Sequence, residues 1–202
     1  AYGSPRTNFA GFFKPDAAVT MTFVTKADPA AIQQDIANFE ATMQTVRAGF
    51  NNGIDESDAE HAEELKAAFA DWFDAMEATI RAGQLDGGAA LDASNDSLTI
   101  IAGATVKDTA KIESGLKKLE ATAAAKQQGF AGIQWNAATH AGVRFHTMSV
   151  PIPADQESPR RLLGSEANIA LGIGEDKVFV AIGRDHLNAV KQAIDASAAE
   201  PN

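Results

Sequence analysis

The chain of 202 residues contains no cysteine. This absence excludes disulfide bonds, thiolate catalysis, iron–sulfur clusters and cysteine-based zinc sites. Aromatic residues make up only 7% of the chain, so small and aliphatic side chains supply much of its 45% hydrophobic content. Ligand pockets are usually lined by aromatic and large apolar groups, so this composition favours closely packed helices over a roomy cavity.

Basic residues are also scarce, with 17 Lys and Arg against 27 Asp and Glu, and the formal net charge is -10. A nucleic-acid surface needs clustered Lys and Arg to displace counterions, and an anionic membrane attracts the same clusters. No apolar run reaches the roughly 18 residues that span a bilayer. We therefore expect no nucleic-acid partner and no integral membrane segment.

Residues 18–25 alternate between apolar and polar side chains, as is typical of a half-buried strand. A helix is predicted to begin at Asp28 and Pro29, because Asp is a good N-cap and Pro fits the first turn. The Asn-Asn-Gly of residues 51–53 is expected to end it, and Asp55 to cap a second helix. Two long helices joined by a short loop form an αα-hairpin, whose arms would each reach roughly 35 Å.

Each of these helices carries an apolar seam with heptad-like spacing. The seam residues are Ile32, Ile36, Phe39, Met43, Val46 and Phe50 in the first helix, and Ala62, Leu65, Phe69, Trp72, Met76 and Ile80 in the second. Two interpretations are open. The helices bury the seam against each other and the sheet, or the seam projects and binds a protein partner or a second copy. The candidate interaction surface then comprises Phe39, Met43, Phe69, Trp72 and Met76.

The rest of the chain predicts three β-hairpins and two further helices. The strands are expected at residues 85–93 and 98–106, at 133–138 and 143–150, and within 167–182. Asp108 is predicted to cap a third helix, and a last helix begins near Asp185. Residues 151–161 are expected to form a polar loop. The N-terminal arm is expected to dock through its phenylalanines, since exposed Phe is costly; these are Phe9, Phe12 and Phe13.

Two stretches of the chain match at a shift of 80 residues, which suggests an internal repeat. Residues 28–39 align with 108–119, and residues 90–103 align with 170–183. Duplication of one unit explains the match. Convergence also explains it, because any strand–cap–helix unit favours Asp at the cap and aliphatic residues inside.

Either origin predicts the same α+β fold: an antiparallel sheet covered by helices, with an inserted long αα-hairpin and an internal strand–helix repeat. We expect one domain over residues 1–202. The first strand and the αα-hairpin occupy residues 17–84, and the repeated β-hairpin–helix units occupy residues 85–130 and 167–198.

A resemblance is carried by the repeated pattern of an apolar strand followed by a helix rich in Ile and Leu. It involves residues 98–103 with 108–119, and residues 178–183 with 187–194. The pattern resembles bacterial exported proteins of unknown function of the DUF3352 kind. The resemblance implies an extracytoplasmic location, periplasmic or secreted, and provides no catalytic residues. Because the chain begins at Ala1 without Met, we expect a processed mature chain or an excised domain.

His140 and His146 flank a predicted turn and are candidate metal ligands, with Asp155 as the nearest carboxylate. They would form the site of a metal-dependent hydrolase only if the fold brought both side chains to one cleft, within about 5 Å. The alternative is that both are surface or capping histidines.

Three arginines, Arg144, Arg160 and Arg161, are candidates to hold a carboxylate or phosphate beside the 151–161 loop. Alternatively, they only keep that loop solvated. The sequence has no HExxH, no glycine-rich phosphate loop and no nucleophile elbow, and it predicts no cofactor. We therefore expect a non-catalytic domain with a structural or partner-binding role; the alternatives are the metal-dependent hydrolase and a carrier of small anionic ligands.

Overall fold

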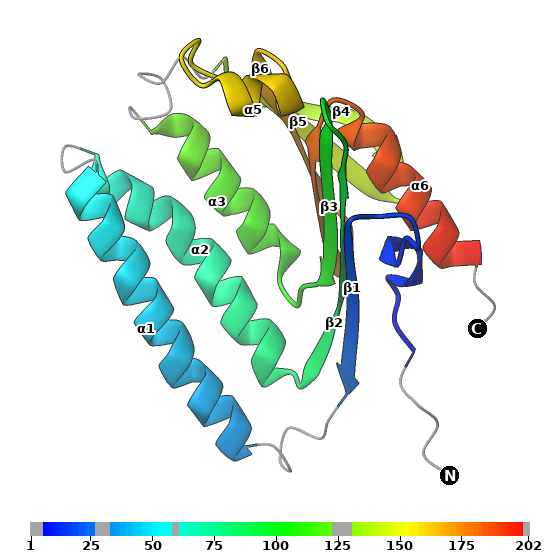
Figure 1. Cartoon of the computed structure of the whole chain (residues 1–202). Coiled ribbons are helices and arrows are strands. Elements are labelled where there is room, and N and C mark those ends of the chain that lie inside the picture. The colour runs from blue at the N-terminus through cyan, green and yellow to red at the C-terminus, as the bar shows by residue number, and fades with distance from the viewer. Residues whose placement is uncertain (1–5, 27–32, 58–60, 123–130, 200–202) are drawn as a thin grey trace.

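A seven-stranded antiparallel sheet is the centre of the computed structural model, which describes residues 6–26, 33–57, 61–122 and 131–199 (Figure 1). The strand order is β1-β2-β3-β7-β6-β5-β4. The strands are β1 (Val19–Lys26), β2 (Gln84–Ala93), β3 (Leu98–Thr105), β4 (Gln134–His140), β5 (Val143–Pro151), β6 (Glu166–Ile173) and β7 (Lys177–Gly183). The helices are η1 (Ala10–Phe12), α1 (Gln33–Ser57), α2 (Ala62–Arg81), α3 (Thr109–Ala121), α5 (Glu157–Leu163) and α6 (His186–Ala199). The predicted α+β class and the three C-terminal hairpins are confirmed.

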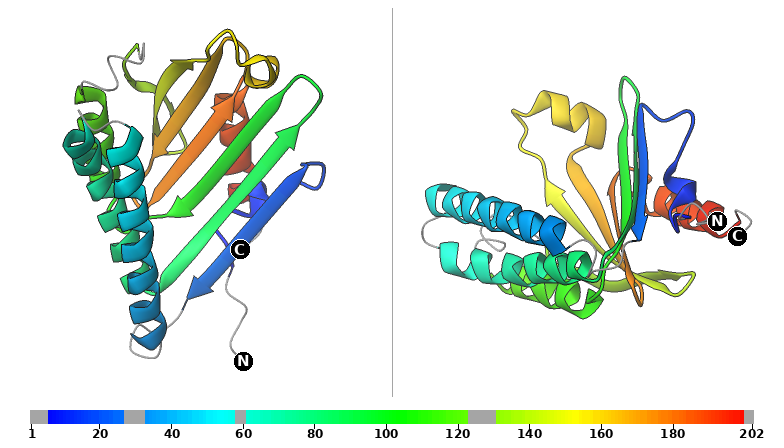
Figure 2. Two further views of the ribbon diagram at one scale, coloured as in Figure 1. Left: turned by 60° about the vertical axis from the view of Figure 1, so that its left-hand side comes forward. Right: turned by 90° about the horizontal axis from the view of Figure 1, so that it is seen from below.

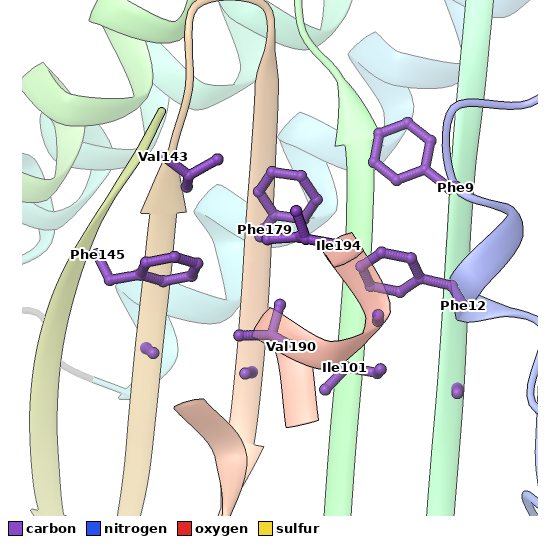
Figure 3. Packing of buried hydrophobic residues seen from close by; sticks show 12 residues of the cluster. Phe9, Phe12, Ile101, Val143, Phe145, Phe179, Val190 and Ile194 are labelled. Carbon is purple, nitrogen blue, oxygen red and sulfur yellow. The ribbon is translucent and has the colours of Figure 1, made fainter. Parts of the chain in front are cut away.

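One face of the sheet, which we call the α6 face, is covered by α6 and the N-terminal arm (Figure 1). A cluster of buried side chains joins these two segments to the strands; it includes Phe9, Phe12, Ile101, Val143, Phe145, Phe179, Val190 and Ile194 (Figure 3). Phe9 and Phe12 are fully buried, as predicted, whereas Phe13 is exposed. The arm therefore docks through two of its three phenylalanines.

Small residues let the arm come close to the strands on the α6 face. A Cβ atom at Gly88 would collide with the Cβ atoms of Phe9 and Phe12, and one at Gly103 would collide with the rings of Phe9 and Phe179. The ring centroids of Phe12 and Phe179 lie 6.0 Å apart in a stacked arrangement. The glycines thus make room for aromatic rings that fill the core.

The opposite face of the sheet is approached by α3, α2 and α1, which together we call the helical arm. Figure 1 shows these helices at increasing distance from the sheet, in that order. Ile112 and Leu116 of α3 pack in one cluster with Leu171 and Ile173 of β6. None of the described helices has the length and hydropathy needed to cross a bilayer.

The prediction that α1 ends at residues 51–53 is wrong, because the helix continues to Ser57. Asn52 and Gly53 lie exposed on the helix, and Ile54 beyond them is buried. Burial of a large apolar side chain stabilises by about 1.5–3 kcal/mol. That exceeds the roughly 1 kcal/mol lost with Gly in a helix, so tertiary packing overrides the local stop signal.

Other local predictions had different outcomes. The predicted cap of α3 is confirmed, because the Asp108 carboxylate accepts a hydrogen bond from the Lys111 amide. Asp55 lies within α1 and does not begin a new helix. The predicted start at Asp28 lies outside the described residues. The 151–161 segment is not wholly a loop, since α5 begins at Glu157.

The two units that match at a shift of 80 residues place their helices on opposite faces of the sheet. Their strands β3 and β7 are direct neighbours. However, α3 packs on the helical-arm side and α6 on the other side. Gly183 at the end of β7 has φ of +129°, whereas its counterpart Gly103 remains inside β3. Residues with side chains rarely adopt such a φ, so Gly183 permits the turn that sends α6 to its own face.

The docking of the arm gives a stability prediction. Replacing buried Phe12 with Ala should lower the free energy of unfolding by about 3–5 kcal/mol, because it leaves a cavity beside Phe179. The same change at exposed Phe13 should cost less than about 0.5 kcal/mol. Denaturant unfolding of both variants measures the difference, and equal costs would show that the arm does not dock as described.

Candidate functional site

The sheet face opposite α6 is apolar across five adjacent strands, and we call it the apolar sheet face. Side chains alternate between faces along a strand, so the pairing register identifies them. From edge to centre they are Val19, Met21, Phe23 and Thr25; Leu85, Gly87, Ala89, Leu91 and Ala93; Leu98, Ile100, Ala102 and Ala104; Val178, Val180 and Ile182; and Ala167, Ile169, Leu171 and Ile173. None is charged and only Thr25 is polar.

The two faces differ in their patterning. On the α6 face, the same strands carry charged or polar groups near their ends, such as Asp86, Asp92 and Lys177, around a small apolar centre. This pattern is usual for a sheet face of which other segments cover only the centre. An apolar face without a polar border is the pattern of a surface that is covered over most of its area.

The helical arm covers only part of the apolar sheet face. Its contacts reach Leu171, Ile173, Val178 and Val180, on β6 and β7. Figure 2 (left) shows β1, β2 and β3 without a helix over them on this side. Accordingly, the exposed fractions are 59% for Val19, 53% for Met21 and 46% for Phe23. These three side chains form the uncovered edge of the apolar sheet face.

The helical arm has one polar side, which is held by ion pairs. Asp74 of α2 pairs with Arg47 of α1 at 3.3 Å and with Lys111 of α3 at 3.2 Å. Asp71 pairs with Lys118 of α3 at 2.8 Å, and the Lys118 ammonium is the main cause that lowers the pKa of Asp71. These pairs tie the three helices together along the side of the arm that carries the charges.

The other side of the arm is apolar and turns toward the sheet, and we call it the inner side. Trp72 and Ala75 of α2 pack in the cluster that contains Ile112 of α3, and the Trp72 indole donates a hydrogen bond to the Ile112 carbonyl at 2.9 Å. Met76 lies one turn after Trp72 and nearly opposite Asp74 on the helix. It is 45% exposed.

The α1 helix extends this inner side. The Phe50 ring meets the Phe69 ring of α2 at a centroid distance of 4.6 Å. Val46 lies one turn before Phe50 and is 50% exposed. The large exposed apolar side chains of the described chain are thus those of the uncovered sheet edge and the inner side, together with Phe13.

The predicted interaction surface is largely internal. Met43 is buried, while Phe69 and Trp72 are half-buried between helices. The side chain of Phe39 lies outside the described part of the chain. Among the four described residues of the set, only Met76 is open to a partner. This part of the prediction is corrected: α1, α2 and α3 bury most of the seam against one another.

Sequence reasoning missed the uncovered sheet edge. Residues 18–25 alternate clearly, and this pattern predicts only that the strand is half-buried. A signal was available in the partner strands, where the residues of β3 are apolar on both faces. A sheet that is apolar on both faces needs other segments packed on each face. A local sequence pattern does not reveal how much of each face those segments cover.

The structure does not bring His140 and His146 together, so the predicted shared metal site is corrected. His140 pairs with Val143 across the hairpin and bonds to Asp195 of α6 at 2.7 Å, on the α6 face. His146 follows Phe145 of the α6 core and therefore points to the opposite face. Among the described residues, no group of three His, Asp or Glu side chains is arranged to hold a metal ion.

His146 is fully buried next to Trp135 and supports the irregular strand β4. Its Nδ1 atom accepts a hydrogen bond from the Asn136 amide at 3.0 Å, where Asn136 has φ of +53°. The proton of the neutral ring therefore resides on Nε2, which has no hydrogen-bond partner among the described residues. Burial lowers the pKa of His146, Arg144 and Lys117 lower it further, and Glu113 opposes them.

The three candidate arginines do not converge. Arg144 pairs with Glu113 of α3 at 2.7 Å near the start of β5. Arg160 donates to the Ile152 carbonyl, beyond the other end of β5, and seven residues of strand separate these ends by roughly 23 Å. Arg161 accepts a hydrogen bond from Arg184 through its backbone carbonyl. The predicted three-arginine anion site is therefore corrected.

A polar pocket of about 320 Å³ lies between the start of α6 and the strands β4, β5 and β6. Its polar lining includes Gln134, Thr147, Ser149 and Asn168. These side chains bond among themselves, with Ser149 donating to Asn168 at 2.7 Å and Thr147 to Gln134 at 3.4 Å. Apart from His186, whose buried ring also lines it, the pocket therefore offers few free polar groups, and its lining has no Asp, Glu, Lys or Arg.

No protein-family model, curated protein or solved structure matches the chain. The resemblance to exported proteins of unknown function therefore stays a prediction, and the candidate site rests on its geometry.

His146 gives a pH prediction. Its folded pKa is lowered, so below about pH 6.5 the unfolded chain binds a proton that the folded chain does not. Stability should hold above that pH and fall as the pH decreases, by up to about 1.4 kcal/mol per unit for one proton. Burial lowers the pKa of His186 too, with the same sign. Denaturant unfolding at pH 7.5 and 5.5 should show a smaller loss in His146→Gln than in the unmodified chain; an unchanged loss would contradict this account.

Proposed function

We propose that this chain is a non-catalytic binding module that buries the apolar surface of another polypeptide. The contact surface consists of the uncovered edge of the apolar sheet face and the inner side of the helical arm. The single observation that carries the proposal is a charge-free sheet face, five strands wide, whose residues Val19, Met21 and Phe23 are exposed. An extracytoplasmic setting is part of the proposal and rests on the resemblance alone.

The magnitudes support binding of moderate strength. Five side chains expose about half of their surface: Val19, Met21, Phe23, Val46 and Met76. At roughly 100 Å² each and about 25 cal/mol per Å², covering them contributes on the order of 10 kcal/mol. Association costs about 4–15 kcal/mol, so these five side chains alone give weak binding. Half-buried neighbours such as Leu91 and Ile100 would have to join the contact in a tight complex.

Because the proposed contact surface is apolar, we expect binding through it to depend little on the salt concentration. Apolar contacts are not screened by ions, whereas contacts between exposed charges weaken beyond the Debye length. The chain carries a formal net charge of -10, so a partner attracted by charge would bind elsewhere on its surface. Binding through the apolar sheet face should therefore persist in about 1 M salt, where the Debye length is roughly 3 Å.

Site-specific photocrosslinking tests the proposal. A photoreactive residue placed at Met21 or Met76 should capture the same partner from the source extract, at low salt and in about 1 M NaCl. The matched control is Phe13, which is equally exposed but lies outside both surfaces. Replacing Phe23 with Ser should reduce capture at Met21 by about fivefold, since roughly 1 kcal/mol of apolar contact is lost. Capture that is equally strong at Phe13, or that disappears at high salt, would overturn the proposal.

A further inference from the structure

Strand β1 is an open edge of the sheet. Among the described strands it pairs with β2 alone, through eight consecutive residue pairs without a bulge. Figure 2 (left) shows no described segment beside its outer edge. Such an edge presents a row of free N–H and C=O groups and can accept another strand.

The other edge of the sheet, β4, is protected. Its pairing with β5 shifts register between Gln134 and Ala138, and Asn136 adopts φ of +53° within that irregularity. Bulges of this kind block the addition of a further strand. The sheet therefore has one edge that can be extended and one that cannot.

Up to its last residue, Lys26, strand β1 has none of the devices that usually protect an edge. From Val19 to Thr25 it has no charged residue, no proline and no glycine. Val19, Met21 and Phe23 lie on the apolar sheet face, and Thr20, Thr22 and Val24 lie on the other face. A regular, exposed, uncharged edge of this length is a docking site for a strand.

We propose that a second copy of this chain occupies the edge, with the two β1 strands paired antiparallel across a twofold axis. The inference rests on the proposed function, since it uses part of the same apolar surface. The strand is complementary to itself when the axis is centred on Met21: Val19 then pairs with Phe23 on one face, and Thr20 pairs with Thr22 on the other. Because β4 cannot continue the sheet, the assembly closes as a dimer.

The size of the contact indicates a weak dimer. Covering three half-exposed side chains in each copy removes roughly 600 Å² from water, and the paired backbones add to this; a stable interface buries about 1,200–2,000 Å². We therefore expect a dimer that forms at tens to hundreds of micromolar chain and dissociates on dilution.

The association state gives the first test. The chain has a mass of 21.2 kDa, so analytical ultracentrifugation of the purified full chain should show a concentration-dependent shift toward twice that mass. Met21→Lys should weaken dimerisation at least tenfold, because it brings like charges together across the axis. Thr139→Lys adds the same charge at an exposed position of β4, on the opposite edge of the sheet, and should leave dimerisation unchanged. Mixing Met21→Lys with Met21→Glu chains should restore a dimer that neither forms alone.

A single-cysteine scan gives a second test that does not depend on the folding of a charged variant. The natural chain has no cysteine, so one introduced at each position from 19 to 25 reports only contacts between copies. Disulfide formation should peak at Met21 and fall on both sides, because facing Cβ atoms lie close only near the axis. Thr139→Cys on β4 is the matched control and should not crosslink.

The outcomes separate this inference from the proposed function. A chain that stays monomeric up to about 1 mM, or crosslinks equally well through position 139, would overturn the dimer. Partner capture through Met21 and Met76 would then still stand as its own result. A dimer that is unaffected by Met21→Lys would also overturn the inference, because its contact would lie elsewhere.

Discussion

The register between β3 and β7 is the constraint on which the rest of the fold depends. These two central strands bring the two halves of the chain together, with Ile100 opposite Ile182 and Ile101 opposite Ala181. A shift by one residue would exchange the two faces of one half. The larger apolar side chains of that half would then face α6, and its smaller side chains would face the helical arm. The observed register instead gives each face one consistent character from β1 to β6.

That separation explains both covers of the sheet. On the α6 face, glycine and alanine at the centre allow Phe9, Phe12 and Val190 to pack directly against the strands. On the other face, larger side chains support α3, and α2 and α1 are stacked outward from it (Figure 1). Because the helices stack away from the sheet and do not spread across it, a long insertion covers a small area. The uncovered sheet edge is the result.

Much of the fold was predictable from local pattern. The alternation in β1, the Asp108 cap and the hairpin turns each depend on neighbours in sequence, and each was found as expected. The continuation of α1 through Gly53 was not predictable, because it depends on the burial of Ile54. The two histidines that flank the turn between β4 and β5 are a second example. His140 and His146 looked like a pair, yet the alternation of a strand sends them to opposite faces.

The candidate site was predicted only in part. Helical spacing identified Met76, but it could not tell that Met43, Phe69 and Trp72 would be occupied by neighbouring helices. The exposure of Met21 depends on how far the arm extends over the sheet, which is a property of the packing of α2 on α3. Local periodicity gives the character of a surface. The extent of its cover comes from tertiary structure.

The central claim is that the apolar sheet face is open between the sheet and the helical arm. The chain has four methionines, so selective methyl labelling gives four NMR signals: Met21, Met43, Met76 and Met148. A soluble paramagnetic agent added to dilute chain should strongly relax the methyls of Met21 and Met76, which are 53% and 45% exposed, and should spare that of Met43 at 5%. Protection of Met21 and Met76 equal to that of Met43 would contradict the account, because the chain would then cover its own apolar face.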